Sequence, residues 1–253
     1  MRKYSITKSL GRLTGCLLLT APLLSTTALA SDFYLTVGVG QAYSSDSDAT
    51  IILGGGEEAF TTNFDNAPIA KIGIGYEVLD YLDLEFVYQH NFSSQSVSDA
   101  DRFTSSTGTD YYQYDIETES VMLNAALNLA DLAEKFAGIE KNYYVEPYVG
   151  FGFGAARNTI DDAYRQNGAG AFSRLQYQRH KETGFAKRLF AGLQIPFSDK
   201  LTFDLSYSYS DYGRAKTSNT YNWISTSGEG NEVQGIHFDH KTHEIGASVR
   251  YNF

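Results

Sequence analysis

The most restrictive feature of the chain is a strict alternation of apolar and polar residues, which recurs in eight separate segments. In residues 201–210, "LTFDLSYSYS", the apolar residues Leu201, Phe203 and Leu205 alternate with Thr202 and Asp204. Successive side chains of a β-strand point to opposite faces, so this period of two predicts a strand with one apolar face. The eight predicted strands cover residues 32–41, 70–78, 82–90, 120–129, 144–155, 184–195, 201–210 and 244–253.

The connections between these segments alternate between long and short. Four of them exceed 20 residues, and the three between those have about three, a dozen and five residues. Long loops at one end and short turns at the other are typical of transmembrane barrels. No segment after residue 30 approaches the roughly 18 consecutive apolar residues of a transmembrane helix. We therefore expect an all-β fold, an eight-stranded antiparallel up-and-down transmembrane β-barrel with four long extracellular loops and three short periplasmic turns.

Glycine indicates which face of such a barrel meets lipid, because a water-soluble barrel such as a lipocalin keeps its apolar face inside. Nine glycines lie on the polar face: Gly38, Gly40, Gly73, Gly75, Gly150, Gly152, Gly154, Gly192 and Gly246. Glycine weakens an exposed strand face, but inside a narrow barrel it leaves room for large side chains such as Tyr148 and Phe190. The apolar face is therefore predicted to contact hydrocarbon.

Aromatic residues gather near the ends of the predicted strands: Phe33, Tyr76, Tyr81, Tyr88, Tyr143, Phe197, Tyr209, Tyr212, Tyr251 and Phe253. Aromatic rings that are apolar at one end and polar at the other favour the membrane interface, so we expect these residues to lie there. Ordinary strand propensity, which also favours aromatics, is the simpler alternative.

The first 30 residues have the pattern of a secretory signal peptide: a basic start, an apolar stretch "LTGCLLLTAPLL", and small residues before Ser31. Removal of residues 1–30 would leave one barrel domain, residues 31–253, without cysteine. It would also remove four basic residues and no acid, which changes the formal charge from −10 to −14. Such acidity argues against nucleic acid as a partner, and the lack of cysteine excludes a disulfide scaffold.

The last segment, residues 244–253, is predicted to close the barrel. Ile245, Val249, Tyr251 and Phe253 lie on its apolar face. Unpaired backbone groups cost several kcal/mol each in lipid, so this strand must pair with the first one. Phe253 is then expected to lie at the inner interface.

Several segments resemble the OmpA-like and opacity-type outer-membrane β-barrels. "GYEVLDYLDLEFVYQH" and "GLQIPFSDKLTFDLSYSY" are similar to the family's periplasmic hairpins, "VEPYVGFGFG" to its fifth strand, and "HEIGASVRYNF" to its closing strand. The resemblance covers roughly residues 31–253, and we expect no peptidoglycan-binding domain after the barrel. It implies Sec-type export to the outer membrane of a Gram-negative-type bacterium, contact with lipid and lipopolysaccharide, and recognition of the closing aromatic by the barrel-assembly machinery.

Nine charged residues point into the barrel by strand parity: Lys71, Glu77, Asp83, Glu85, Glu146, Arg188, Asp204, Glu244 and Arg250. The interior of eight strands is only wide enough to be filled by side chains. We therefore expect a buried network that neutralises itself and plugs the lumen. A gated ion path and a catalytic carboxylate cluster are the functional alternatives.

We predict no catalytic, cofactor-binding or metal site. His237, His240 and His243 recur at intervals of three, which does not place them on one face of a strand, so we interpret them as solvated histidines of a loop and strand end. A hydrolase would need a histidine held against a nucleophile. His90, near the outer end of the third strand, and His180, in the third long loop, are candidates, but no triad spacing is legible.

The long connections suggest the function. Residues 42–67 contain five acids and no base, whereas residues 157–182 contain five Arg or Lys residues. The acids could bind cations loosely and the bases could meet lipopolysaccharide phosphates or acidic host polymers, although hydration alone explains charged loops. Residues 51–60, "IILGGGEEAF", could form a hairpin above the membrane. Our leading hypothesis is an outer-membrane barrel whose loops serve adhesion, surface interaction or envelope integrity, followed by a narrow porin-like channel and then a hydrolase.

Overall fold

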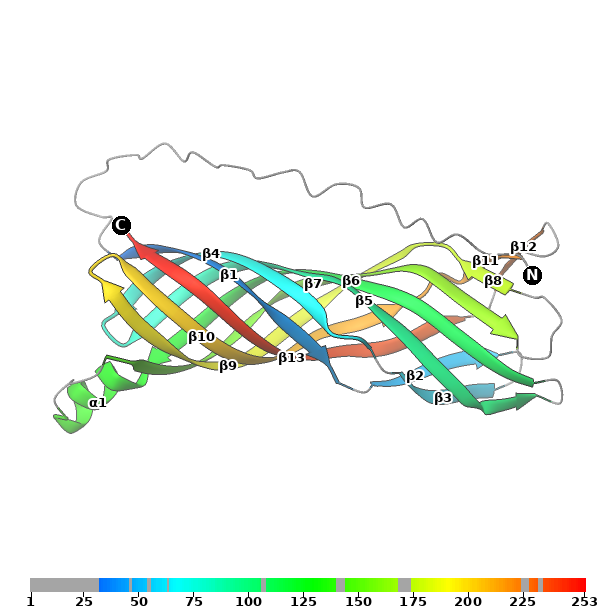
Figure 1. Ribbon diagram of the computed structural model, residues 1–253, viewed down its shortest axis with the longest axis horizontal. Coiled ribbons are helices and arrows are strands. Elements are labelled where there is room, and N and C mark those ends of the chain that lie inside the picture. The colour runs from blue at the N-terminus through cyan, green and yellow to red at the C-terminus, as the bar shows by residue number, and fades with distance from the viewer. Residues whose placement is uncertain are drawn as a thin grey trace, which may run out of the picture.

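The structure is a computed structural model that describes residues 32–45, 47–53, 56–62, 64–105, 108–139, 144–167, 174–223, 228–231 and 234–253. The predicted signal peptide, residues 1–30, and Tyr143 lie outside these ranges. The described part forms a closed antiparallel barrel with a short helix at one end (Figure 1). Within the described residues, no helix is long and apolar enough to span a bilayer.

Eight strands form the barrel wall, as predicted. They are β1 (Phe33–Ser44), β4 (Ala67–Leu79), β5 (Leu82–Ser105), β6 (Gly108–Asn128), β7 (Glu146–Asn167), β9 (His180–Ser198), β10 (Leu201–Lys216) and β13 (Gln234–Asn252). Each pairs antiparallel with the next strand of this series. The register of β1 with β13 runs from Tyr34 opposite Asn252 to Ser44 opposite Thr242, which closes the barrel and confirms the predicted closing strand.

The two faces of the wall have the predicted polarity. In β1, Phe33, Leu35 and Val37 are exposed on the outside, whereas Tyr34 and Thr36 are buried inside. Glycine provides the inner space: a Cβ added at Gly75 would overlap the ring of Tyr34, and one at Gly150 would overlap Phe190. The small residues on the polar face therefore accommodate large neighbours across the strands, as the sequence indicates.

The strands are much longer than the ten residues expected. β5 has 24 residues, β6 has 21 and β7 has 22. At about 3.3 Å per residue and a tilt of about 45°, 22 residues rise about 50 Å along the barrel axis, roughly twice the apolar band of a transmembrane barrel. Much of the predicted loop sequence is therefore continued barrel wall. His90 consequently lies within β5 rather than near its outer end, and His180 begins β9 rather than lying in a loop.

Five shorter strands lie at the end of the barrel that carries the long connections, which we call the long end. β2 (Ser47–Leu53) and β3 (Gly56–Thr62) form a hairpin, which confirms the one predicted in residues 51–60, and β2 also pairs with β13. β8 (Arg174–Tyr177) pairs with β7 and with β11 (Thr220–Trp223), which in turn pairs with β12 (Gly228–Asn231).

A helix occupies the longest of the short connections and is not anticipated by the period-two analysis. α1 (Leu129–Ala137) begins directly after β6, where the side chain of Asn128 accepts hydrogen bonds from the backbone nitrogens of Ala130 and Asp131 at 3.0 and 3.3 Å. Gly138 ends it with a positive φ of 65°. An asparagine cap before the helix and a glycine after it are ordinary helix boundaries.

Candidate functional site

The lumen is organised in layers, and the layer at the short-turn end is built around Arg250. Its guanidinium donates to Asp83 at 2.7 Å, forms an ion pair with Glu77, and lies 3.5 Å from the centre of the Tyr34 ring. These partners come from β1 and from the hairpin of β4 and β5. Arg250 therefore holds the closing strand to the first hairpin through charge and cation–π contact.

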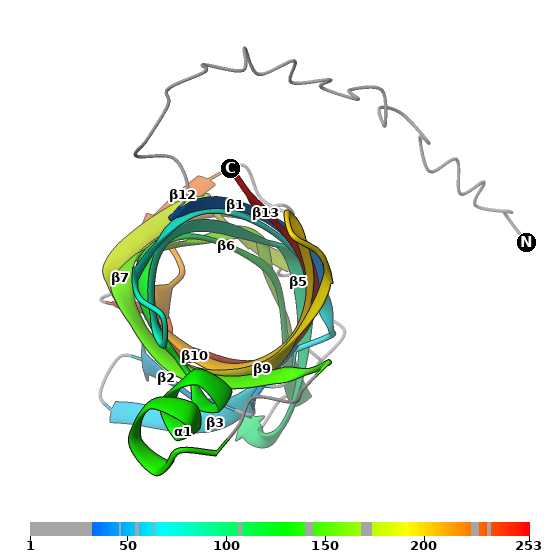
Figure 2. The ribbon, with the colours of Figure 1, turned by 90° about the vertical axis from the view of Figure 1, so that its left-hand side faces the viewer.

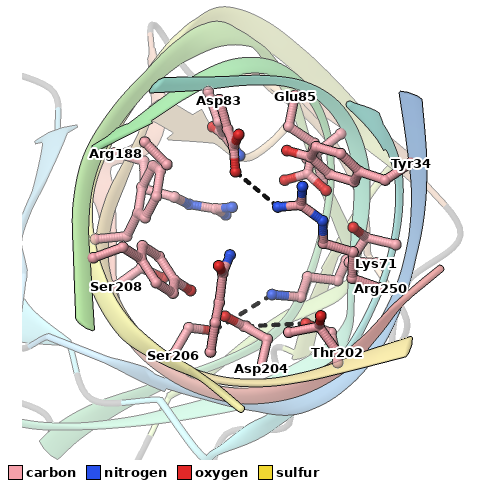
Figure 3. A pocket seen from close by; sticks show the side chains of 18 residues that line it. Tyr34, Lys71, Asp83, Glu85, Arg188, Thr202, Asp204, Ser206, Ser208 and Arg250 are labelled. Carbon is pink, nitrogen blue, oxygen red and sulfur yellow. Dashed lines mark hydrogen bonds and ion pairs between the residues drawn. The ribbon is translucent and has the colours of Figure 1, made fainter. Parts of the chain in front are cut away.

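A small cavity lies deeper in the barrel. Its volume is about 80 Å³, and its lining includes Lys71, Glu85, Asp204, Tyr148 and Phe190. Figure 3 shows Lys71, Arg188 and Arg250 reaching inward from different parts of the wall. Lys71 donates to Ser206 at 3.4 Å, and Ser248 donates to Asp204 at 3.0 Å. A space of this size holds a few water molecules.

The next layer is a buried network centred on Arg188 and Glu244, which are only 6% and 2% exposed. Arg188 donates to Ser210 and Gln89 at 2.8 Å, to Tyr212 at 2.9 Å and to Glu244 at 3.2 Å. Glu244 also accepts hydrogen bonds from Ser208, Thr242, Gln89 and Tyr212. A buried ion pair is tolerated when its remaining polar atoms are bonded in this way.

The prediction that Tyr212 lies at the membrane interface is wrong, because Tyr212 is fully buried in this network. The register of β10 with β13 shifts between Asp211 and Arg214, and Gly213 there has a positive φ of 73°. Tyr212 occupies an inward-facing position of β10. Its hydroxyl accepts a hydrogen bond from Arg188 and donates one to Glu244.

Above this network the inward face becomes apolar. Nine buried residues from β2, β6, β7, β8, β10 and β13 form one cluster: Ala49, Tyr114, Ile116, Ile160, Ala163, Tyr177, Ala215, Ile236 and Phe238. Phe64 packs against them. The alternation in β6 and β13 is inverted here, since Asp115, Glu117 and Asp239 lie on the outward face. This is the polarity of a water-soluble barrel with a packed interior.

Charged side chains surround the outside of the wall where the exposed apolar belt ends. Arg157 pairs with Glu119, Arg179 lies 3.3 Å from Asp161, and Lys187 lies 3.3 Å from Asp211. The hydrogen bond from Arg157 lowers the pKa of Glu119. Two of the five bases predicted to meet phosphates or acidic polymers, Arg157 and Arg179, are thus already paired with acids.

The histidines differ from the sequence interpretation in one respect. His240 is buried rather than solvated, stacked 5.7 Å from the Tyr212 ring and close to Phe64. Burial lowers its pKa to about 4. Within the described ranges, no group of three or more His, Cys, Asp or Glu residues is placed to hold a metal ion. His90 and His180 each face a glutamate, Glu117 at 3.2 Å and Glu182 at 3.3 Å.

The nine predicted lumen charges thus fall into adjoining groups, and Asp83, Arg188 and Arg250 also line the cavity. Arg250 joins Glu77 and Asp83, and Arg188 joins Glu244. Lys71, Glu85 and Asp204 line the cavity, and Glu146 accepts a hydrogen bond from Asn128 at 3.0 Å. These groups also contain Gln89, Tyr212 and Tyr34. These three were not predicted as lumen residues of the network, although alternation along their strands places each of them on the inward face.

Comparisons with known proteins agree with this geometry. A family model described as the outer membrane protein beta-barrel domain matches residues 16–253. Comparison with curated proteins gave no match. Among solved structures, the outer membrane protein OprG from Pseudomonas aeruginosa is 18% identical and matches with a TM-score of 0.51, covering 88% of this chain and 97% of that one. At this identity, the likeness concerns the fold alone.

Two further solved structures match with lower scores. Neisserial surface protein A is 15% identical with a TM-score of 0.48, and the match covers 87% of this chain and 97% of that one. The outer membrane protease OmpT from Escherichia coli is 11% identical with a TM-score of 0.47, and the match covers 90% and 99% of the two chains.

Proposed function

Because the chain belongs to the outer membrane protein β-barrel domain family, we propose that it is a non-conducting outer-membrane scaffold that holds a rigid extracellular β-structure for contact with external surfaces. The family match confirms the resemblance to OmpA-like and opacity-type barrels. Adhesion to host or matrix polymers, or to the lipopolysaccharide around the protein, is the role that such an extension would serve.

The inverted polarity of the long end is the observation that carries this proposal. Within the apolar belt, Leu123 and Phe151 face outward, whereas farther along the same strands Ile116 and Ile160 face inward and are buried. A segment that buries its apolar side chains inside and exposes charge outside is built for water. Within the described residues, the wall continues out of the membrane as paired strands, and such ordered β-structure lowers the entropy cost of binding.

The same layering supports a closed lumen. The Arg188 and Glu244 network lies below an apolar cluster to which six strands contribute. An ion crossing this region would have to leave water and enter a packed apolar interior, which is strongly unfavourable. We expect no unitary conductance from the purified chain in planar bilayers. Reproducible channels that change with Arg188→Ala would favour the porin-like alternative instead.

Binding by whole cells tests the surface role. Cells that display the full chain are compared with cells displaying a variant in which a short turn replaces β11 and β12. β11 pairs with β8 and β12 pairs with β11, so both lie at the end of the series of paired strands and outside the eight wall strands, and the trimmed barrel should still form. We expect the trimmed variant to lose adhesion to matrix polymers while remaining in the membrane. Glu134→Ala, at the opposite end of the barrel, serves as the matched control. Equal adhesion with and without the two strands would contradict the proposal for this part of the surface.

A further inference from the structure

The helix α1 lies at the short-turn end of the barrel, which is the periplasmic end in this architecture. Figure 2, which looks at this end, shows α1 beside the opening and projecting outside the ring of strands rather than lying across it. The helix begins directly after β6 and contacts β7. Its position therefore places it at the level where the outer wall of the barrel meets the periplasmic surface of the membrane.

The sequence of α1 has a sharply divided pattern. Leu129, Leu132, Ala133 and Phe136 follow the spacing i, i+3, i+4, i+7 and share one face of the helix. Asp131, Glu134 and Lys135 occupy the opposite face. Although Phe136 is an apolar residue and contacts the Tyr81 ring at 5.9 Å between centroids, it remains 72% exposed. The apolar face of α1 is thus only partly covered by the protein.

This uncovered face continues the surface that contacts lipid. Leu127, on the outward face of β6, is followed two residues later by Leu129, the first residue of the helix, and both are exposed. On the other side, Val145 and Val149 carry the exposed apolar surface onto β7. Lys135 lies 4.6 Å from the centre of the Tyr81 ring, an arrangement that suits the polar edge of a membrane.

We propose that α1 is an interfacial anchor whose apolar face is inserted in the periplasmic leaflet of the outer membrane, among phospholipid acyl chains. Helices of this kind lie in the membrane plane with the apolar face about 5–10 Å inside the headgroup boundary. The helix carries two acids and one base, so its attachment depends on apolar contact and not on attraction to anionic lipid. The anchor fixes the depth of the barrel at its periplasmic end, independently of any role of the extracellular strands.

Tryptophan fluorescence tests this placement. The chain has one tryptophan, Trp223 in β11, which is replaced by phenylalanine to give a silent background. Phe136→Trp then reports from the apolar face, and Glu134→Trp is the matched control on the polar face of the same helix. Both variants are folded into zwitterionic phospholipid vesicles, and folding is checked by the shift in gel mobility before and after boiling.

We expect bromine-labelled phospholipid to quench the Phe136→Trp signal at least about twofold more strongly than that of Glu134→Trp, with the opposite order for aqueous iodide. The contrast should persist at high salt. If Phe136→Trp fails to fold, Leu132→Trp probes the same face. Equal iodide quenching at both positions would show that the face is in water. Protection from iodide without quenching by lipid would show that another protein or a second copy covers it, and either result would overturn the proposal.

Discussion

Substituting Arg188 by methionine removes the cation at the centre of the lumen and leaves Glu244 buried without its charge partner. Arg188 donates four hydrogen bonds of 2.8–3.2 Å, and Glu244 keeps only neutral donors once Arg188 is lost. Breaking one partner of a buried pair typically costs about 3–5 kcal/mol, and we expect about 4 kcal/mol for Arg188→Met. Glu244→Gln should cost about 3 kcal/mol, since it leaves the guanidinium uncompensated.

The pair of changes together distinguishes a coupled network from two independent contacts. If Arg188 and Glu244 stabilise each other, the double variant should lose about 4 kcal/mol rather than the sum of about 7 kcal/mol, a coupling of about 3 kcal/mol. The free energy of unfolding is measured by urea titration of the barrel in lipid vesicles, with folding followed by gel mobility and fluorescence. Single losses below about 1 kcal/mol, or losses that simply add, would refute the reasoning.

A neighbouring residue provides the control for this experiment. Lys187 precedes Arg188 but points outward, where its side chain is 67% exposed and lies 3.3 Å from Asp211. Exposed ion pairs contribute about 0–1 kcal/mol, so Lys187→Met should change the free energy of unfolding by less than about 1 kcal/mol. A loss as large as that of Arg188→Met would indicate a general effect on β9 and not the buried network.

Three further predictions concern other parts of the barrel. Burial lowers the pKa of His240 from 6.5 to about 4, so on acidification the imidazole is protonated in the unfolded chain at a higher pH than in the folded chain. The free energy of unfolding should therefore fall by about 2 kcal/mol between pH 7 and pH 5. His240→Phe should remove this pH dependence from urea titrations across that range. Gly150→Val would overlap Phe190 and should cost at least about 1–3 kcal/mol by the same titration, whereas Gly184→Ala, with open space around the added Cβ, should change little. Deleting residues 251–253 removes backbone pairing of β13 with β1 and β10 and should lower the membrane-inserted fraction in cells far more than a three-residue cut between β11 and β12, so equal insertion would contradict it.

The barrel wall within the membrane could be predicted from sequence because its rule is local. Lipid requires an apolar outer residue at every second position, and the narrow interior requires small residues between large ones. The local sequence is therefore enough to assign the outward or inward face of residues such as Val37 and Gly38 in β1, or Phe151 and Gly152 in β7. The closing strand follows from the same rule, since an unpaired edge is too costly in lipid.

The continuation of the strands beyond the membrane was not predicted, although a signal for it exists. In residues 113–117, "QYDIE", Tyr114 and Ile116 alternate with polar residues, but the apolar parity is opposite to that of residues 120–129. If apolar residues are expected to face outward along the whole strand, this inverted stretch is assigned to a loop. The helix α1 was missed for a related reason, because Leu127 and Leu129 continue the alternation of β6 into the first helical residue.

The sequence alone determined that the chain forms an eight-stranded barrel and which residues face its interior, since both follow from a period of two. Only the tertiary structure decided which inward charges meet. Arg250 reaches Glu77 and Asp83 rather than Asp204, which lies on the neighbouring strand β10, and Arg188 reaches Glu244 across 56 positions of the chain. These pairings depend on the stagger of each strand against the next, accumulated around a closed barrel. The sequence of a single strand does not contain this accumulated stagger, which is fixed only when the last strand pairs with the first.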